Sequence, residues 1–203
     1  MRLGATRRLA SGVNAIAIGT QTVANSIDSF AGGFNASALA LNAMALGSSA
    51  NASGRDAYAA GLLSEASGSN SLALGTQATA SQESAYAAGS RANASGIKSM
   101  ALGFRSIASN TSSYAAGTCA DASGANAMAL GTAAISSAGS SFAAGHFANA
   151  SGSNSTAIGT YAAASAADAY AVGFFASASA TNALAFGPTA NASGVNSIAL
   201  GSD

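Results

Sequence analysis

The chain has 203 residues and a formal net charge of zero, because it contains only seven Lys/Arg and seven Asp/Glu. Charged residues make up 7% of the chain, against about 25% in ordinary soluble domains. This composition excludes the basic surface that binds nucleic acid or an anionic membrane, and no apolar run approaches the roughly 18 residues that insert into a bilayer. With 24 Gly, one Pro and no Trp, the chain lacks the bulky side chains of a single globular core.

A repeat of 14 residues runs along the chain without insertion or deletion. Ala always stands two residues before the repeated glycine and Ala or Ser four residues before it, whereas large apolar residues such as Met44 and Leu46 occupy the third and first positions. A variable pair and a stretch such as Ala-Asn-Ala-Ser follow the glycine. The repeated glycines are Gly19, Gly33, Gly47, Gly61, Gly75, Gly89, Gly103, Gly117, Gly131, Gly145, Gly159, Gly173, Gly187 and Gly201.

Both halves of the repeat alternate with a period of two, which predicts two short strands and two turns in each unit. Strict repetition of such a unit predicts an all-β solenoid whose equivalent strands stack in parallel. No helical spacing of apolar residues is present. Residues 11–203 are interpreted as the repeat domain of about 14 coils, and residues 1–10 as a lead-in. The sequence stops in the middle of a repeat, at Ser202 and Asp203.

Neighbouring strand residues point to opposite faces, so the invariant Ala and its two large neighbours are predicted on different faces. An interior of methyl groups, at about 0.8 kcal/mol per buried CH₂, does not offset about 1–2 kcal/mol of backbone entropy per residue. We therefore expect obligate self-association through the large residues in a closed cyclic assembly. The predicted seam residues are Ile16, Ile18, Phe30, Met44, Leu46, Tyr58, Leu72, Leu74, Tyr86, Met100, Leu102, Tyr114, Met128, Leu130, Phe142, Ile158, Tyr170, Leu184, Phe186, Ile198 and Leu200.

Four copies of the strand motif are especially clear: residues 42–47, 70–75, 126–131 and 196–201. Together with the A-x-A-S-G stretch, they resemble the 14-residue head repeat of trimeric autotransporter adhesins, the YadA-like head. The resemblance covers nearly all of residues 11–203. It implies a left-handed parallel β-roll, an intertwined homotrimer, and display at the outer membrane of a bacterium for adhesion to host matrix or surfaces. Complete family members continue into a neck, a coiled-coil stalk and a membrane barrel, which this sequence does not contain. Two interpretations are consistent with the sequence. One is a fragment of an adhesin, and the other is the structural shaft of a phage or viral fibre or of an extracellular filament.

Six aromatic residues outside the seam stand one or two positions after a turn glycine, together with Leu62 and Leu63. They form either an exposed ridge for a partner or a packing edge against a neighbouring subunit. Matrix proteins or glycans are the expected partners, bound by many weak contacts, because a roll filled with Ala is expected to hold no cavity of about 300–1,000 Å³. The candidate partner-binding residues are Phe34, Phe104, Phe147, Tyr161, Phe174 and Phe175.

The remaining polar residues favour structural roles. His146 is the only histidine and Cys119 the only cysteine, so one chain offers no catalytic pair, cofactor site or zinc cluster; three copies of His146 in a trimer are a weaker metal hypothesis. N-x-S/T sequons occur at Asn35, Asn51, Asn93, Asn110, Asn149, Asn154 and Asn191, and the repeat itself generates most of them. Stacked amide ladders are expected for Asn14, Asn42, Asn70, Asn126, Asn154, Asn182 and Asn196.

Overall fold

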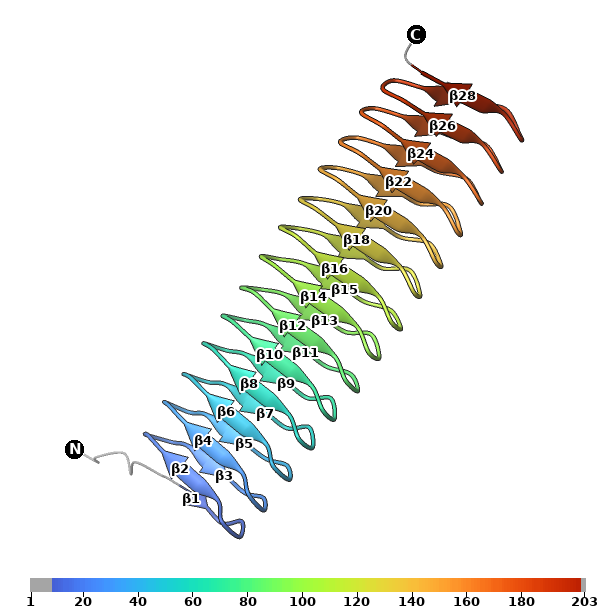
Figure 1. The fold of residues 1–203 in the computed structure, drawn as a ribbon. Helices are drawn as coiled ribbons and strands as arrows, with labels where there is room; N and C mark the ends of the chain where they lie inside the picture. Colours follow the sequence, from blue (N-terminus) through green and yellow to red (C-terminus); the bar gives the residue numbers. More distant parts are fainter. Residues whose placement is uncertain (1–8, 202–203) are drawn as a thin grey trace, which may run out of the picture. The chain divides into compact units, whose positions relative to one another are not determined.

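The computed structural model describes residues 9–201 and divides into two compact units, Met1–Lys98 and Ser99–Asp203. Each unit is built from short strands joined by turns, and the described residues contain no helix. A membrane-spanning helix is accordingly not found in that part of the chain. Every coil carries a three-residue strand on one side and a two-residue strand on the other (Figure 1).

The first unit contains two parallel sheets. The three-residue strands of the first sheet are β2 (Ile16–Ile18), β4 (Phe30–Gly32), β6 (Met44–Leu46), β8 (Tyr58–Ala60), β10 (Leu72–Leu74) and β12 (Tyr86–Ala88). The two-residue strands of the second sheet are β1 (Leu9–Ala10), β3 (Val23–Ala24), β5 (Ser37–Ala38), β7 (Asn51–Ala52), β9 (Glu65–Ala66), β11 (Thr79–Ala80) and β13 (Asn93–Ala94).

The second unit repeats this arrangement. Its three-residue strands are β14 (Met100–Leu102), β16 (Tyr114–Ala116), β18 (Met128–Leu130), β20 (Phe142–Ala144), β22 (Thr156–Ile158), β24 (Tyr170–Val172), β26 (Leu184–Phe186) and β28 (Ile198–Leu200). Its two-residue strands are β15 (Ile107–Ala108), β17 (Asp121–Ala122), β19 (Ile135–Ser136), β21 (Asn149–Ala150), β23 (Ala163–Ala164), β25 (Ser177–Ala178) and β27 (Asn191–Ala192).

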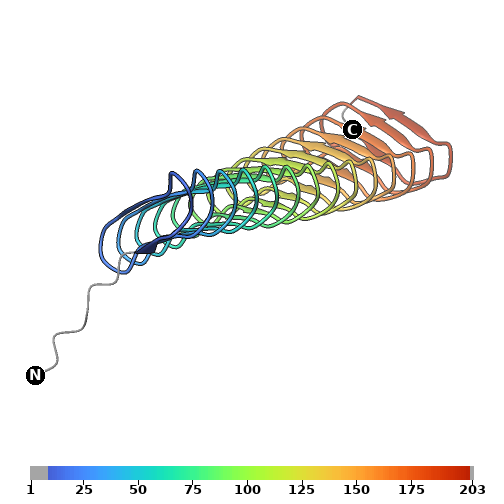
Figure 2. The same cartoon turned by 90° about the horizontal axis from the view of Figure 1, so that it is seen from below.

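The register of the sheets follows the sequence repeat. Each residue pairs in parallel with the residue 14 positions later, as Ala73 does with Ala87 in the first unit and Ala101 with Ala115 in the second. Figure 2 shows that the coils are flattened loops with a strand on each broad side. The predicted all-β parallel solenoid of 14-residue coils is therefore confirmed.

The lead-in predicted for residues 1–10 lies outside the described residues except for its last two. Leu9 and Ala10 form β1, which pairs with Val23 and Ala24 of β3. The final residues 202–203 also lie outside the described part of the chain.

The interior of each coil is filled by alanine from both sheets. Ala73 of β10 and Ala80 of β11 are both fully buried, and the largest fully buried side chains among the described residues are one threonine, Thr22, and serines. Several of these hydroxyls are bonded locally: Thr22 donates to the carbonyl of Gly19 at 3.3 Å and Ser64 to that of Gly61 at 3.1 Å. The interior is thus as thin as the sequence predicts, and its few hydroxyls largely bond to the adjacent turns.

The repeated glycine occupies a backbone conformation that other residues rarely adopt. Gly75 has a φ of +128°, and a Cβ added to it would lie 2.7 Å from the carbonyl oxygen of Gly89 in the next coil. Its own N–H donates to Ala60 of the preceding coil at 2.8 Å. Both the dihedral angle and the close approach of the next coil therefore require glycine.

We expect Gly75→Ala to lower the free energy of unfolding by about 3 kcal/mol or more, because it combines backbone strain with a steric clash. Gly139→Ala is the matched control, since the nearest atom to its added Cβ is 4.0 Å away and its φ is not positive; this change is expected to stay within about 0.5 kcal/mol. Chemical denaturation of both variants measures the difference, and equal effects would contradict the close-approach argument.

Candidate functional site

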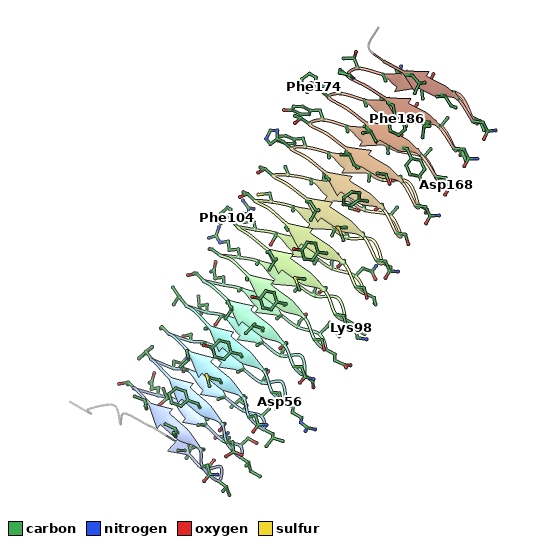
Figure 3. The ribbon with its side chains drawn as sticks, in the orientation of Figure 1. Asp56, Lys98, Phe104, Asp168, Phe174 and Phe186 are labelled. Carbon is green, nitrogen blue, oxygen red and sulfur yellow. The ribbon has the colours of Figure 1, made fainter. Side chains whose placement is uncertain are left out.

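One outer sheet face in each unit carries the large apolar side chains predicted for the seam. In every three-residue strand the central Ala turns into the interior, so its two neighbours lie on the outside, as in Met128–Leu130. Phe186 lies over this face of its sheet in Figure 3. Many of these side chains are exposed in the chain taken alone, including Ile16, Met44 and Ile158. The face therefore presents a continuous apolar surface within each unit, of a kind that monomers rarely leave open to water.

Aromatic rings on this face account for the small residues that follow them. A Cβ added to Gly32 would lie 3.1 Å from Cε1 of Phe30 and 3.3 Å from Cδ2 of Leu46. The ring of Phe30 therefore already occupies the space beside position 32, and Leu46 enters it from the next coil, with which Gly32 pairs. This packing gives a physical reason for the alternation of aromatic-plus-small and aliphatic-plus-aliphatic coils.

The predicted partner-binding residues lie at the turn that follows the repeated glycine. All six, Phe34, Phe104, Phe147, Tyr161, Phe174 and Phe175, are exposed in the described chain, and so are Leu62 and Leu63. In the second unit, Phe104 and Phe174 lie at one edge of the coils and Asp168 at the opposite edge (Figure 3). Phe34, Leu62 and Leu63 belong to the first unit. A role in binding remains a prediction.

Three of these rings form a stack, which we call the aromatic ladder: Phe147, Tyr161 and Phe175. Ring centroids lie 5.3 Å apart between Phe147 and Tyr161 and 4.7 Å apart between Tyr161 and Phe175. His146 meets Phe147 edge to face at 4.4 Å, and Phe174 meets Phe175 in the same way at 4.6 Å. The sequence identifies these residues by type, and their spacing of 14 is the signal that places them in one column.

Every ladder residue has a left-handed backbone conformation, with φ of 56° at Phe147, 59° at Tyr161 and 54° at Phe175. This conformation costs an L-residue about 1–2 kcal/mol, and an aromatic pair contributes about 0.5–1.5 kcal/mol. Stacking therefore offsets a strain that the turn imposes on every described residue two positions after the repeated glycine, a set of positions that we call the turn column. The residue types do not predict this strain, because the column carries few of the Asn or Gly residues that usually mark a left-handed backbone.

Leu63 bears the same strain without a ladder, since its φ is 56° and its side chain is 50% exposed. We expect Leu63→Asn to stabilise the protein by about 1 kcal/mol, because Asn adopts the left-handed conformation more readily. Leu62→Asn is the control: Leu62 is 48% exposed but has no positive φ. Thermal unfolding of the two variants tests this, and an equal shift in Tm would exclude relief of strain as the cause.

The second turn of the coil is built mainly by Asn and Asp residues, with Ser or Lys in several coils. Asn42 and Asp56 have φ of 54° and 55°, and the Asn42 amide donates to Asp56 Oδ1 at 2.7 Å. The same contact joins Asn154 to Asp168 at 3.2 Å, and two amides meet between Asn182 and Asn196 at 3.0 Å. The predicted amide ladder is present between Asn182 and Asn196, whereas Asn42 and Asn154 each donate to a carboxylate instead of a second amide. The left-handed backbone adds a second reason for Asn and Asp at this position.

A shallow depression of about 400 Å³ lies on the outer surface of the second unit, at one end of the aromatic ladder. The expectation of a roll without a ligand-sized cavity concerned the interior, and this depression on the outer surface is a feature that the repeat pattern does not predict. It arises where the small Ala133 stands between Cys119 and Phe147 in the turn column. The lining residues are Arg105, Ile107, Cys119, Asp121, Ala133, Ile135 and Phe147.

The remaining candidate residues are the metal-ligand types, the single cysteine and the sequon asparagines. No group of three or more His, Cys, Asp or Glu that could hold a metal occurs among residues 9–201. Cys119 is a free, exposed thiol. Among the sequon asparagines, Asn51 and Asn93 have a buried Oδ1 atom, whereas Asn35, Asn149 and Asn191 are exposed.

These features define a class: a parallel β-solenoid of 14-residue coils with an alanine interior and one apolar outer face. A family model described as the YadA head domain repeat (2 copies) matches most of the chain, at residues 10–36, 38–64, 66–92, 80–106, 122–148, 136–162, 164–189 and 178–203. The chain therefore belongs to the YadA head repeat family, whose heads are adhesive or structural, self-associating and displayed at the cell surface. The comparison with curated proteins gave no match.

Proposed function

We propose that the chain is the head of a bacterial trimeric surface adhesin, in which three left-handed rolls pack through the outer faces of their three-residue strands. The observation that carries this proposal is the exposed apolar sheet face within each unit. Membership of the YadA head family supports the same assembly. The trimer supplies the large apolar contacts that the alanine interior lacks.

The energetic argument rests on what the interior omits. Burying a Leu, Ile, Phe or Met side chain contributes about 1.5–3 kcal/mol, and residues of this kind, such as Met44 and Leu102, lie outside the interior. Packing three copies face to face brings these side chains out of water. The seam therefore carries a large share of the folding free energy, and folding is coupled to assembly.

Adhesion belongs to the outer turns, because the seam is taken up by assembly. The turns carry the exposed aromatic residues, and each one appears three times in a trimer. Weak contacts repeated in this way raise the avidity by about 10²–10⁴. Extracellular matrix proteins or glycans are the partners that this surface, exposed and nearly neutral, would bind.

A structural shaft is the alternative function. The same roll in a phage or viral fibre or an extracellular filament would only hold another domain away from its base. The regular seam suits this role equally, whereas the exposed aromatic ladder favours the adhesive one, since a shaft has no need of exposed rings.

Leu102→Asp tests the seam. We expect this change to prevent assembly, because it places three unpaired carboxylates close together among apolar side chains, each at a cost of several kcal/mol. Thr118→Asp introduces the same charge at an exposed turn position and is expected to assemble normally. Analytical ultracentrifugation at micromolar concentration distinguishes the two; a stable folded monomer of the unaltered protein would contradict the proposal.

Adhesion is tested by binding of the assembled protein to immobilised matrix proteins and glycans. A variant with Phe104, Phe147, Tyr161, Phe174 and Phe175 all changed to Ser is expected to lose most of its binding while its circular dichroism is unchanged. If the unaltered trimer adheres to no surface, the shaft function is the correct one.

A further inference from the structure

The depression at the end of the aromatic ladder has an aromatic wall with a free face. Tyr161 covers one face of the Phe147 ring, at a centroid distance of 5.3 Å. His146 lies beside the pair and not on the other face, because its centroid is 4.4 Å from that of Phe147 and only 5.8 Å from that of Tyr161. Ala133 stands 14 residues before Phe147 and carries only a methyl group where the next coils carry rings, and both residues line the depression.

Apolar side chains continue from this ring along the neighbouring sheet. Ile107 and Ile135 project from β15 and β19 on either side of Asp121 of β17, with which both pair. All three residues line the depression together with Phe147. The depression therefore combines one aromatic face with two aliphatic walls, which is the usual basis of a small-ligand site.

One positively and one negatively charged side chain complete the lining of the depression. Arg105 and Asp121 form no ion pair and no side-chain hydrogen bond within the described part of the chain, although both line the depression. Asp121 is half-buried, and its Oδ1 atom is buried without a hydrogen-bond partner, so its carboxylate retains unused capacity to accept hydrogen bonds. Arg105 can bind an anionic group, and Asp121 can accept a hydrogen bond from a hydroxyl group. Together they fit a ligand that carries both kinds of group.

We propose that this depression binds an acidic sugar unit, a pyranose that carries a carboxylate. The C–H face of the pyranose packs on the free face of Phe147. Its carboxylate pairs with the guanidinium of Arg105, whose planar fork matches two carboxylate oxygens, and a sugar hydroxyl donates to Asp121. This inference deepens the adhesive function proposed above, on which it rests for its biological purpose.

The other ligand chemistries fit less well. A neutral sugar leaves the guanidinium of Arg105 without a partner. An acidic peptide side chain supplies the carboxylate but no rigid C–H face for Phe147. The volume of about 400 Å³ suits one sugar ring, and in an assembly of identical chains the site is repeated, which compensates for weak binding at each copy.

Cys119 allows the site to be tested directly, because it lines the depression and is the only cysteine of the chain. The rate of its alkylation by iodoacetamide is measured on the assembled protein, with and without a sugar. Methyl glucuronide and the methyl glycoside of N-acetylneuraminic acid are the acidic probes, methyl glucoside is the neutral one, and an acetylated Asp-containing tripeptide is the peptide probe. By mass action, an acidic sugar at ten times its dissociation constant is expected to slow alkylation about tenfold.

Three variants locate the protection. Arg105→Ala and Ala133→Phe are expected to abolish it, the latter because a fourth ring would cover the free face of Phe147. Ala133→Phe should fold, since Phe147 and Tyr161 occupy the same position in the next two coils with the same backbone conformation. Arg91→Ala is the control that retains protection, because Arg91 bonds to Gln77 and does not line the depression. For each variant, the rate of Cys119 alkylation with sugar is compared with the rate of the same variant without sugar.

The outcomes separate the hypotheses. Protection by the acidic sugars that depends on Arg105 supports the proposal. Absence of protection by either acidic sugar overturns it, and so does equal protection by methyl glucoside or by the peptide. Protection that persists in Arg105→Ala overturns the proposed carboxylate contact. Because alkylation is read in solution and adhesion on a surface, loss of adhesion with intact protection counts against the adhesive function and not against the site.

Discussion

An interior that admits little more than a methyl group is the constraint on which the rest of the structure depends. Two sheets face each other across this interior, and alanine supplies most of the contacts between them. Every larger side chain must therefore lie outside. The apolar outer face is thus a direct result of the thin interior, and it links the fold of one chain to association with others.

The two turns of each coil meet their backbone requirements in different ways. At the second turn, Asn and Asp adopt the left-handed conformation and also bond to one another between coils, as Asn42 and Asp56 do. At the first turn, the repeated glycine and the backbone contacts to the preceding coil fix the path, and the residue two positions later adopts a positive φ whatever its type. Many residue types consequently occur at that position, at different costs in strain, and they determine the surface chemistry there.

The sequence was sufficient for the parallel solenoid, because a period of two within the strands and a period of 14 between coils require equivalent strands to stack in parallel. The strands, the turns and the side of the sheet on which Met44 and Leu46 lie all follow from these periods. The strain at Leu63 or Tyr161 could not be predicted in this way, because neither residue type signals a left-handed backbone. The depression does not follow from these periods either, since it depends on the size of Ala133 relative to neighbours 14 residues away. Only a comparison of side-chain volumes along that column predicts it.

The fixed step between coils turns the outer surface into a lattice with one site per coil. Residues that lie 14 positions apart in the chain are neighbours in space, as the ladder of Phe147, Tyr161 and Phe175 shows. A surface feature on such a lattice is specified by the order of residues in one column and not by the folding of a loop. Shifting three or four side chains by 14 positions would move a feature of this kind along the roll, so new surfaces can arise by exchanging or duplicating coils while the backbone stays the same.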